Sequence, residues 1–255
     1  MRSVPQNKDI YTSFARGYDV VMRDVDFPQW SEHVLRLIDH FEFNGKRLLN
    51  VACGTGNMEM TWAAAGYSIA SVDRSLEMLE IARIKIPKSA AVELIQSDMT
   101  TLDLGEKFDL ATCLYDSVNY LTNANDVRKF FHCAASHLAT GGGFIFDVAT
   151  EANILENFSQ TTYAENFEDF AYIWDNEYNI RTKICKSDFH FFYKDPEDGS
   201  FRRQTEVHYQ KIYTTRDLSK WLKQAGFEVL GVFDGFNFDS AGSSCDRIHF
   251  IARKL

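Results

Sequence analysis

The chain has 255 residues, a length that suits one large α/β domain or one domain with an insertion. Its 45% hydrophobic content supports a sizeable core, and with only four prolines and 25% charged residues no long disordered stretch is expected. The 36 acidic side chains outnumber the 27 basic ones, and the resulting net charge of -9 repels phosphate backbones, so we expect no nucleic-acid partner.

The cysteines and the N-terminus both indicate the cytoplasm. The five cysteines are odd in number, widely spaced and without a C-x-x-C pair, which is typical of reduced thiols and not of a disulfide framework or a zinc site. Residues 1–9 lack the apolar run of a signal peptide. No stretch reaches the roughly 20 apolar residues that cross a bilayer. We expect a cytoplasmic monomer or homodimer without a metal site or a membrane contact.

Two helices are expected ahead of the first strand, over about residues 11–22 and 29–41, packed at the ligand-binding face of the sheet. Short apolar runs then alternate with amphipathic segments. Such near-continuous apolar runs are typical of buried parallel strands that are covered on both faces. The five runs span residues 47–52, 67–72, 92–96, 108–114 and 143–148.

Helical patterns lie between these runs. Ser75 is expected to cap a helix over residues 76–85, and Asn125 a second helix that ends at glycines 141–143. Alternation of strands and helices predicts a right-handed, doubly wound parallel sheet, which binds its ligand at the carboxyl ends of the strands.

The pattern changes after Thr150. Three runs rich in aromatic and β-branched residues, over 171–178, 181–193 and 201–213, predict an antiparallel β meander over the mouth of the site. A turn signal at 194–199 separates the last two runs. The α/β pattern then resumes with a helix over residues 217–225, ended by Gly226, and two strands that would form an antiparallel edge, over 227–233 and 247–253.

The predicted fold is therefore α/β, with a mostly parallel seven-stranded sheet and an inserted antiparallel meander. Three parts are expected. Residues 1–45 would form an N-terminal helical cap, residues 46–150 and 214–255 the ligand-binding α/β domain, and residues 151–213 the insertion over the active site.

The turn after the first strand gives the first indication of a ligand. Gly54 and Gly56 let the backbone bend sharply and let a ligand approach closely. In a dinucleotide-binding turn a third glycine would stand where this chain has Glu59, whose carboxylate would repel a pyrophosphate. A ligand without phosphates fits better, although a plain strand–helix turn and a nicotinamide-dependent oxidoreductase stay open as alternatives.

Two further signals follow at the ends of the next strands. Asp73 ends the second strand, where a carboxylate can accept hydrogen bonds from both ribose hydroxyls. Asp98 and Met99 end the third, where an acid can bind the amine of adenine and a thioether can pack on its ring. In order along consecutive strands, these residues predict a nucleoside site.

With these motifs the sequence resembles the class I S-adenosylmethionine-dependent methyltransferases over about residues 9–150. Within them it is similar to the small-molecule branch that includes glycine N-methyltransferase and the amino-sugar N,N-dimethyltransferases. The resemblance implies a Rossmann-like methyltransferase fold, S-adenosylmethionine as cofactor and S-adenosylhomocysteine as product. The motifs that carry it are VACGTG at 51–56, VDRS at 72–75, SDM at 97–99, FDL at 108–110, the tyrosine-rich segment 11–19 and YDSVNYL at 115–121.

The resemblance also implies roles for individual residues. Glycines and alanine of the first turn would contact the methionine part, Asp73 the ribose, and Asp98 with Met99 the adenine. The backbone of Leu114 and Tyr115 would face the cofactor's amino group, while aromatic side chains of the N-terminal segment would close the pocket. The other residues expected at the cofactor are Tyr11, Tyr18, Trp30, Ala52, Cys53, Gly54, Gly56, Arg74 and Met78.

The turn departs from the family at two positions. Asn50 stands where the family usually has aspartate, and Ala52 where it often has glycine. Asn50 can still orient the turn by hydrogen bonding but loses a charge that would attract the cationic ligand. A protein that binds S-adenosylmethionine without catalysis is therefore a third hypothesis.

The acceptor is expected to be a small molecule that is methylated on a nitrogen or an oxygen atom. A methyl sulfonium is already activated, so holding the nucleophile in line is enough and a general base is optional. We therefore assign no catalytic residue. The candidates for contact with the substrate are Asp116, Asn119 and His208, which have structural alternatives as loop-capping or strand residues.

Overall fold

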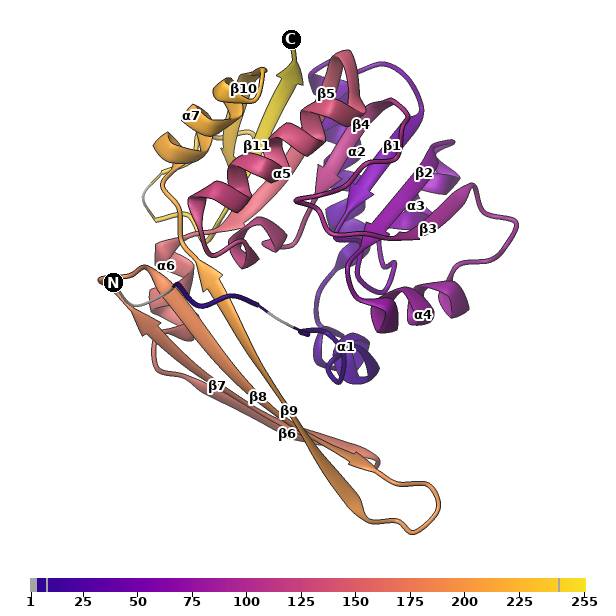
Figure 1. Cartoon of the computed structure of the whole chain (residues 1–255), viewed down its shortest axis with the longest axis vertical. Coiled ribbons are helices and arrows are strands. Elements are labelled where there is room, and N and C mark those ends of the chain that lie inside the picture. The colour runs from indigo at the N-terminus through magenta and orange to yellow at the C-terminus, as the bar shows by residue number, and fades with distance from the viewer. Residues whose placement is uncertain (1–3, 8, 243) are drawn as a thin grey trace.

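The computed structural model describes residues 4–7, 9–242 and 244–255. Its centre is a seven-stranded sheet in the order β10-β11-β5-β4-β1-β2-β3 (Figure 1). Strands β1 to β5 run parallel, whereas β11 pairs antiparallel with both β5 and β10, which confirms the doubly wound fold and its antiparallel edge. The strands are β1 (Arg47–Val51), β2 (Ser68–Asp73), β3 (Val92–Gln96), β4 (Phe108–Cys113), β5 (Leu138–Ala149), β10 (Phe227–Asp234) and β11 (Arg247–Lys254).

Helices cover both faces of this sheet, with α5 and α7 on one face and α2 and α3 on the other (Figure 1). Neighbouring residues of each central strand therefore point into different cores: Leu48 packs with α2 and α3, and Leu49 with α5 and α7. No helix of the described ranges is long and apolar enough to span a membrane. The helices are α1 (Ala15–Val21), α2 (Phe27–His40), α3 (Glu59–Ala64), α4 (Leu76–Lys85), η1 (Ser117–Tyr120), α5 (Ala124–His137), α6 (Glu151–Asn153), η2 (Ile154–Phe158) and α7 (Thr215–Gln224).

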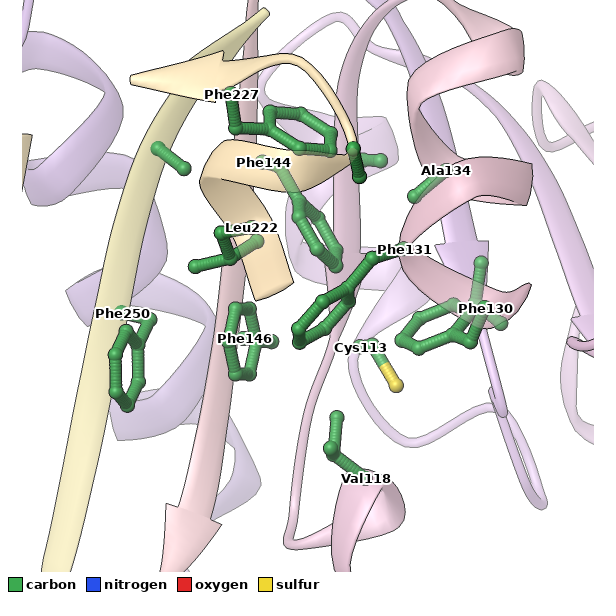
Figure 2. Close-up of a cluster of buried hydrophobic side chains, with 14 of the residues drawn as sticks. Cys113, Val118, Phe130, Phe131, Ala134, Phe144, Phe146, Leu222, Phe227 and Phe250 are labelled. Atoms are coloured by element: carbon green, nitrogen blue, oxygen red, sulfur yellow. The ribbon is translucent and has the colours of Figure 1, made fainter. Parts of the chain in front are cut away.

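Aromatic side chains fill the core on the α5 and α7 side (Figure 2). Phe131 of α5 contacts Phe144 and Phe146 of β5, and Phe146 stacks on Phe250 of β11 with ring centroids 4.9 Å apart. All four rings are fully buried. Because close-packed rings resist displacement, this core holds β4, β5 and β11 in register and so fixes the residues that follow β4.

The helix caps were predicted with mixed success. Ser75 caps α4 as expected, its hydroxyl accepting from the amide of Met78 at 3.0 Å. The cap of α5 is Asn123 and not Asn125, with the amide of Asp126 as donor at 3.0 Å. The helix also ends at His137, and the glycines expected to end it lie in β5.

Gly143 shows why those glycines are needed in a strand. A Cβ at Gly143 would lie 2.8 Å from the ring of Phe43, in the loop after α2. Only glycine therefore lets β5 pack so closely against this ring. The prediction of a helix C-cap at these glycines was therefore wrong, because Gly143 serves close packing within a strand.

The first predicted helix is much shorter than expected. Helix α1 begins at Ala15, and Tyr11 has a positive φ of 60° that no helix allows. The amide of Tyr11 donates to the carboxylate of Glu206 at 2.8 Å, so a contact with the distant strand β9 (Phe201–Lys211) replaces the first helical turns. Helix α2 begins two residues earlier than predicted because Asp26 caps it and Pro28 occupies its first turn.

Strands β6 to β9 form a second, four-stranded antiparallel sheet, sheet B, which extends away from the first sheet (Figure 1). This confirms the predicted meander but adds β6, which the sequence pattern did not reveal. The inner face of sheet B is aromatic, where Phe189 and Phe191 pack on Phe14. The strands are β6 (Thr162–Asn166), β7 (Phe170–Asn179), β8 (Ile184–Lys194) and β9 (Phe201–Lys211).

Two fully buried histidines predict a loss of stability in acid. The rings of His33 and His249 lie 4.9 Å apart, and burial lowers the pKa of His33 to about 3 and that of His249 to about 4. An unfolded histidine titrates near 6.5, so below that pH the unfolded chain binds more protons. The free energy of unfolding is therefore fully maintained above about pH 6.5 and falls as the pH drops toward about 4.

Urea denaturation between about pH 7 and about pH 4.5 measures this contribution. His33→Leu should reduce the slope of unfolding free energy against pH by up to about 1.4 kcal/mol per pH unit. The exposed His132 offers a control, since His132→Leu should leave the slope unchanged. Equal slopes for wild type and His33→Leu would contradict the assignment.

Candidate active site

A cavity of about 660 Å³ runs from the carboxyl ends of β1 to β4 to the space beneath sheet B. Its volume falls within the roughly 300–1,000 Å³ of small-molecule sites. The N-terminal segment, the strand ends, residues 153–158 and the inner face of sheet B form its walls. The predicted residues that line it are Tyr11, Tyr18, Ala52, Cys53, Gly54, Asp73, Arg74, Met78, Asp98, Met99, Leu114, Tyr115 and Asp116.

The turn after β1 has the open shape that the glycines predict. Ala52 and Gly54 both have positive φ, at 60° and 58°. A Cβ at Gly54 would meet nothing within 4 Å, so this position faces open space. Gly56 has a different role and does not line the cavity: a Cβ there would lie 2.8 Å from the side chain of Ile86, at the end of α4.

Asn50 and Glu59 support the turn from below. The amide of Asn50 donates to Oε1 of Glu59 at 2.6 Å, and its oxygen accepts from the hydroxyl of Thr112 at 2.9 Å. Glu59 also accepts from Ser71 at 3.0 Å. Burial raises the pKa of Glu59, and the hydrogen bonds from Asn50 and Ser71 partly offset this rise. An acid thus stands beneath the turn although position 50 lacks one, and its carboxylate is directed inward.

Asp73 lies at the wall of the cavity and is tied to both neighbouring turns. Its Oδ2 accepts from the amide of Gly54 at 2.8 Å and its Oδ1 from the amide of Ser75 at 2.9 Å. Burial raises the pKa of Asp73, and the two backbone donors oppose that effect. Each carboxylate oxygen keeps a second lone pair, so the pair of ribose hydroxyls fits this acceptor.

Asp98 and Met99 lie together at the end of β3, on the same cavity. Oδ1 of Asp98 accepts from the amide and the hydroxyl of Thr100, at 2.8 and 2.6 Å, which fixes the carboxylate. Its Oδ2 lies 3.9 Å from the guanidinium of Arg74 and is free to accept from an amine. The acid and the thioether therefore suit an adenine ring.

Tyr11 and Tyr18 close the cavity from the N-terminal side. The hydroxyl of Tyr11 donates to that of Tyr120 at 2.6 Å. Asp19 ties α1 to the first turn, because its Oδ1 accepts from Thr55 at 2.7 Å. Asp19 belongs to the tyrosine-rich segment 11–19, for which only aromatic contacts were predicted.

Trp30 does not line the cavity, although the sequence places it there. It packs edge-on against Tyr115 at 5.5 Å between ring centroids, and the guanidinium of Arg247 lies 5.1 Å from its ring. Trp30 therefore supports a cavity residue from behind, because α2 packs on the outer side of β4.

Asn119 and His208 also lie outside the lining. Asn119 joins β5 to β9: its amide donates to the carbonyls of Ala149 and Lys211, and its oxygen accepts from the amide of Ala149 at 3.0 Å. Both of its N–H donors and one lone pair of its oxygen are used at these strands, so the structure gives Asn119 a bridging role between them. The ring of His208 is fully buried and bonds to Glu206 at 2.8 Å.

Glu206 does not line the cavity, but it holds a segment that does, and no sequence pattern revealed it. Its carboxylate accepts from the amides of Tyr11, Thr12 and Phe14 and from the hydroxyl of Thr12, at 2.8 to 3.1 Å. Burial raises its pKa, but the bonds from His208 and the backbone outweigh burial and hold the pKa below its usual range. Glu206 thus fastens the N-terminal segment to sheet B beside the cavity.

The far end of the cavity carries Asp116, Gln210 and Arg247. Oδ1 of Asp116 accepts from Arg247 at 2.8 Å, and Oδ2 accepts from the amide of Gln210. Sequence reasoning found Asp116 but neither partner, since β9 and β11 lie about a hundred residues away in the chain and only the fold brings them here.

The fold and the strand-end residues define a Rossmann-like protein that binds a nucleoside without phosphates, and the turn, Asp73 and Asp98 fit S-adenosylmethionine. A family model described as a methyltransferase domain matches residues 48–142. A protein of Geobacillus sp. (strain WCH70) described as a methyltransferase is 31% identical over 96% of this chain and 99% of its own length. YqeM of Bacillus subtilis (strain 168), also described as a methyltransferase, is 30% identical over 96% and 97%.

A solved S-adenosylmethionine-dependent methyltransferase from Clostridium acetobutylicum ATCC 824 is similar throughout, with a TM-score of 0.82, 28% identity and coverage of 96% of this chain and 99% of that one. The chain belongs to the S-adenosylmethionine-dependent methyltransferases. This confirms the enzyme class and the cofactor, and it leaves the nicotinamide-dependent oxidoreductase without support. The contacts of individual residues with the cofactor stay predictions.

Proposed function

We propose that this methyltransferase transfers a methyl group to the nitrogen of a small amine in the cytoplasm. The relatives support the amine. An N,N-dimethyltransferase of an amino sugar from Saccharopolyspora spinosa is 33% identical over 54% of this chain and 52% of its own. A glycine/sarcosine N-methyltransferase from Aphanothece halophytica is 35% identical over 42% and 41%. The free thiols of the five cysteines are consistent with a reducing compartment.

The observation that carries the proposal is the continuity of the cavity. Its nucleoside-binding end at Asp73 and Asp98 runs without interruption into an acceptor end beneath sheet B. Phe158, Tyr163 and Trp174 give the acceptor end aromatic walls.

Bound S-adenosylmethionine supplies a methyl group on a cationic sulfur, and transfer forms the N–C bond as the C–S bond breaks and its electron pair stays on sulfur. The residues of this chain hold and enclose the reactants. Asp73 and Asp98 would hold the nucleoside. Tyr18 and Tyr115 would exclude water from between the two ends of the cavity, since both line it there.

Transfer of a labelled methyl group to a panel of small amines, phenols, alcohols and carboxylic acids tests the proposal. We expect turnover with amines, and most with amino sugars or amino acids that fit beneath sheet B. Turnover confined to oxygen acceptors would overturn nitrogen methylation. Binding of S-adenosylhomocysteine without turnover on any member of the panel would overturn the proposed acceptor class.

A further inference from the structure

We infer that Asp116 binds the acceptor's amino group and selects amines over neutral or anionic acceptors, with Arg247, Gln210 and Asp147 holding its carboxylate in place. This inference deepens the proposed function and rests on it. It stands on four observations: the backbone at the end of β4, the partners of the carboxylate, the local charge and the shape of the cavity.

The backbone after β4 is built to direct this side chain. Tyr115 and Asp116 both have positive φ, at 60° and 52°, a conformation that residues other than glycine rarely adopt and almost never in succession. The amide of Asp116 donates to Oδ2 of the fully buried Asp147 at 2.9 Å, which holds this conformation. Strained backbone of this kind persists where the surroundings enforce it, which is typical of functional sites.

The carboxylate of Asp116 is held at both oxygens and still has capacity left. Arg247 donates to Oδ1 at 2.8 Å and Gln210 donates to Oδ2. Each carboxylate oxygen can accept a second hydrogen bond. Because Asp116 lines the cavity, the lone pairs that its two partners leave are available to an N–H donor in the cavity.

The charge of this cluster favours an amine. Asp116 and Asp147 set two carboxyl groups against the one guanidinium of Arg247, so the cluster has a net charge of -1 when both are ionised. Burial raises the pKa of Asp116, and the charge of Arg247 with the hydrogen bonds from Arg247 and Gln210 acts against this effect. The guanidinium also bonds to Asp147 and lies 5.1 Å from the ring of Trp30 and 5.0 Å from that of Tyr115. Both donors of its Nη1 atom are thus taken up by the two carboxylates, which offset the positive charge that would otherwise attract a substrate carboxylate or phosphate.

The position of Asp116 along the cavity suits a group next to the transferred methyl. It directly follows Leu114 and Tyr115 in the chain, which the family resemblance places at the amino group of the cofactor, and it lines the same cavity. A hydrogen bond from the ammonium group to Asp116 would therefore orient the nitrogen toward the cofactor. Once one ammonium proton passes to the carboxylate of Asp116, the nitrogen has the lone pair that forms the N–C bond.

Binding of three probes of one shape tests the inference. Cyclohexylamine, cyclohexanol and cyclohexanecarboxylate are titrated by calorimetry into the protein saturated with S-adenosylhomocysteine. The wild type should bind the amine about 10-fold more tightly than the alcohol, and the carboxylate most weakly. A wild type without preference for the amine, or without binding of any of the three, overturns the inference and does so without a variant.

The variants then assign the preference to one residue. Asp116→Asn should remove the amine preference while the affinity for S-adenosylhomocysteine stays unchanged. Gln210→Ala, which frees one carboxylate oxygen, should reduce the amine preference about 3-fold. Asp169, an exposed aspartate in the turn between β6 and β7, provides the matched control, and Asp169→Asn should keep the preference. An unchanged preference in Asp116→Asn overturns the role of Asp116.

Turnover distinguishes this inference from the proposed function. If no amine is methylated, the proposed function fails. If amines are methylated and Asp116→Asn keeps the wild-type kcat/KM for amines, the proposed function stands and only the inference about Asp116 fails.

Discussion

Replacing Glu206 with alanine should lower the free energy of unfolding by about 3 kcal/mol, since a loss of up to about 3 kcal/mol is the scale for removing a charged acceptor from buried donors. The substitution leaves the amides of Tyr11, Thr12 and Phe14 and the ring nitrogen of His208 without their acceptor. Buried donors without a partner carry their full desolvation cost. Urea denaturation at neutral pH measures the change.

The same substitution should also weaken cofactor binding, because it releases the segment that carries Tyr11 over the cavity. Glu206→Gln should be milder, since it keeps one carbonyl oxygen for the backbone amides. Glu168→Ala in the turn between β6 and β7 removes an exposed carboxylate and serves as the control. A loss of stability below about 1 kcal/mol for Glu206→Ala would show that water replaces the carboxylate and that Glu206 does not fasten the segment.

Replacing Asp73 with alanine should weaken the binding of S-adenosylhomocysteine by about 1–3 kcal/mol, the scale for the loss of a charged hydrogen-bond partner. This corresponds to a dissociation constant roughly 5- to 150-fold higher. The physical reason is twofold: the ribose hydroxyls lose their acceptor, and the amide of Gly54 loses the bond of 2.8 Å that shapes the turn. Isothermal titration calorimetry gives the constant directly.

The exposed Asp39 of α2 provides the control for Asp73, since Asp39→Ala removes the same charge far from the cavity lining. Its dissociation constant should equal that of the wild type. An unchanged constant in Asp73→Ala would refute the ribose assignment and with it the nucleoside reading of the strand ends.

Local signals in the sequence predicted the sheet and the nucleoside end of the site. The apolar runs gave β1 to β5 within a few residues, apart from the start of β5, because a strand buried on both faces leaves no polar alternation. Ser75 was identified as a cap because capping depends on a few adjacent residues. Asp73 and Asp98 could be found because each ends a strand, and strand ends of a parallel sheet meet at one edge.

Long-range contacts were beyond local reasoning, and the errors show it. Helix α1 lost its first turns to Glu206, almost 200 residues away in the chain. Asn119 and His208 were taken as substrate candidates from their places after the fourth strand and on the meander. Asn119 instead bonds to β5 and β9, and the ring of His208 packs behind Tyr11, which lines the cavity in front of it. No sequence pattern marks Arg247 as the partner of Asp116.

The sequence by itself therefore determined the α/β sheet, the turn at Gly54 and the carboxylates at the strand ends, because each depends on residues that are close along the chain. Only the tertiary structure decided the acceptor end. Asp116, Gln210 and Arg247 come from three distant segments, and their alignment depends on how β9 and β11 pack against the end of β4. Charge and hydrogen bonding act through space, so the chemistry of this end becomes visible only when the chain is folded.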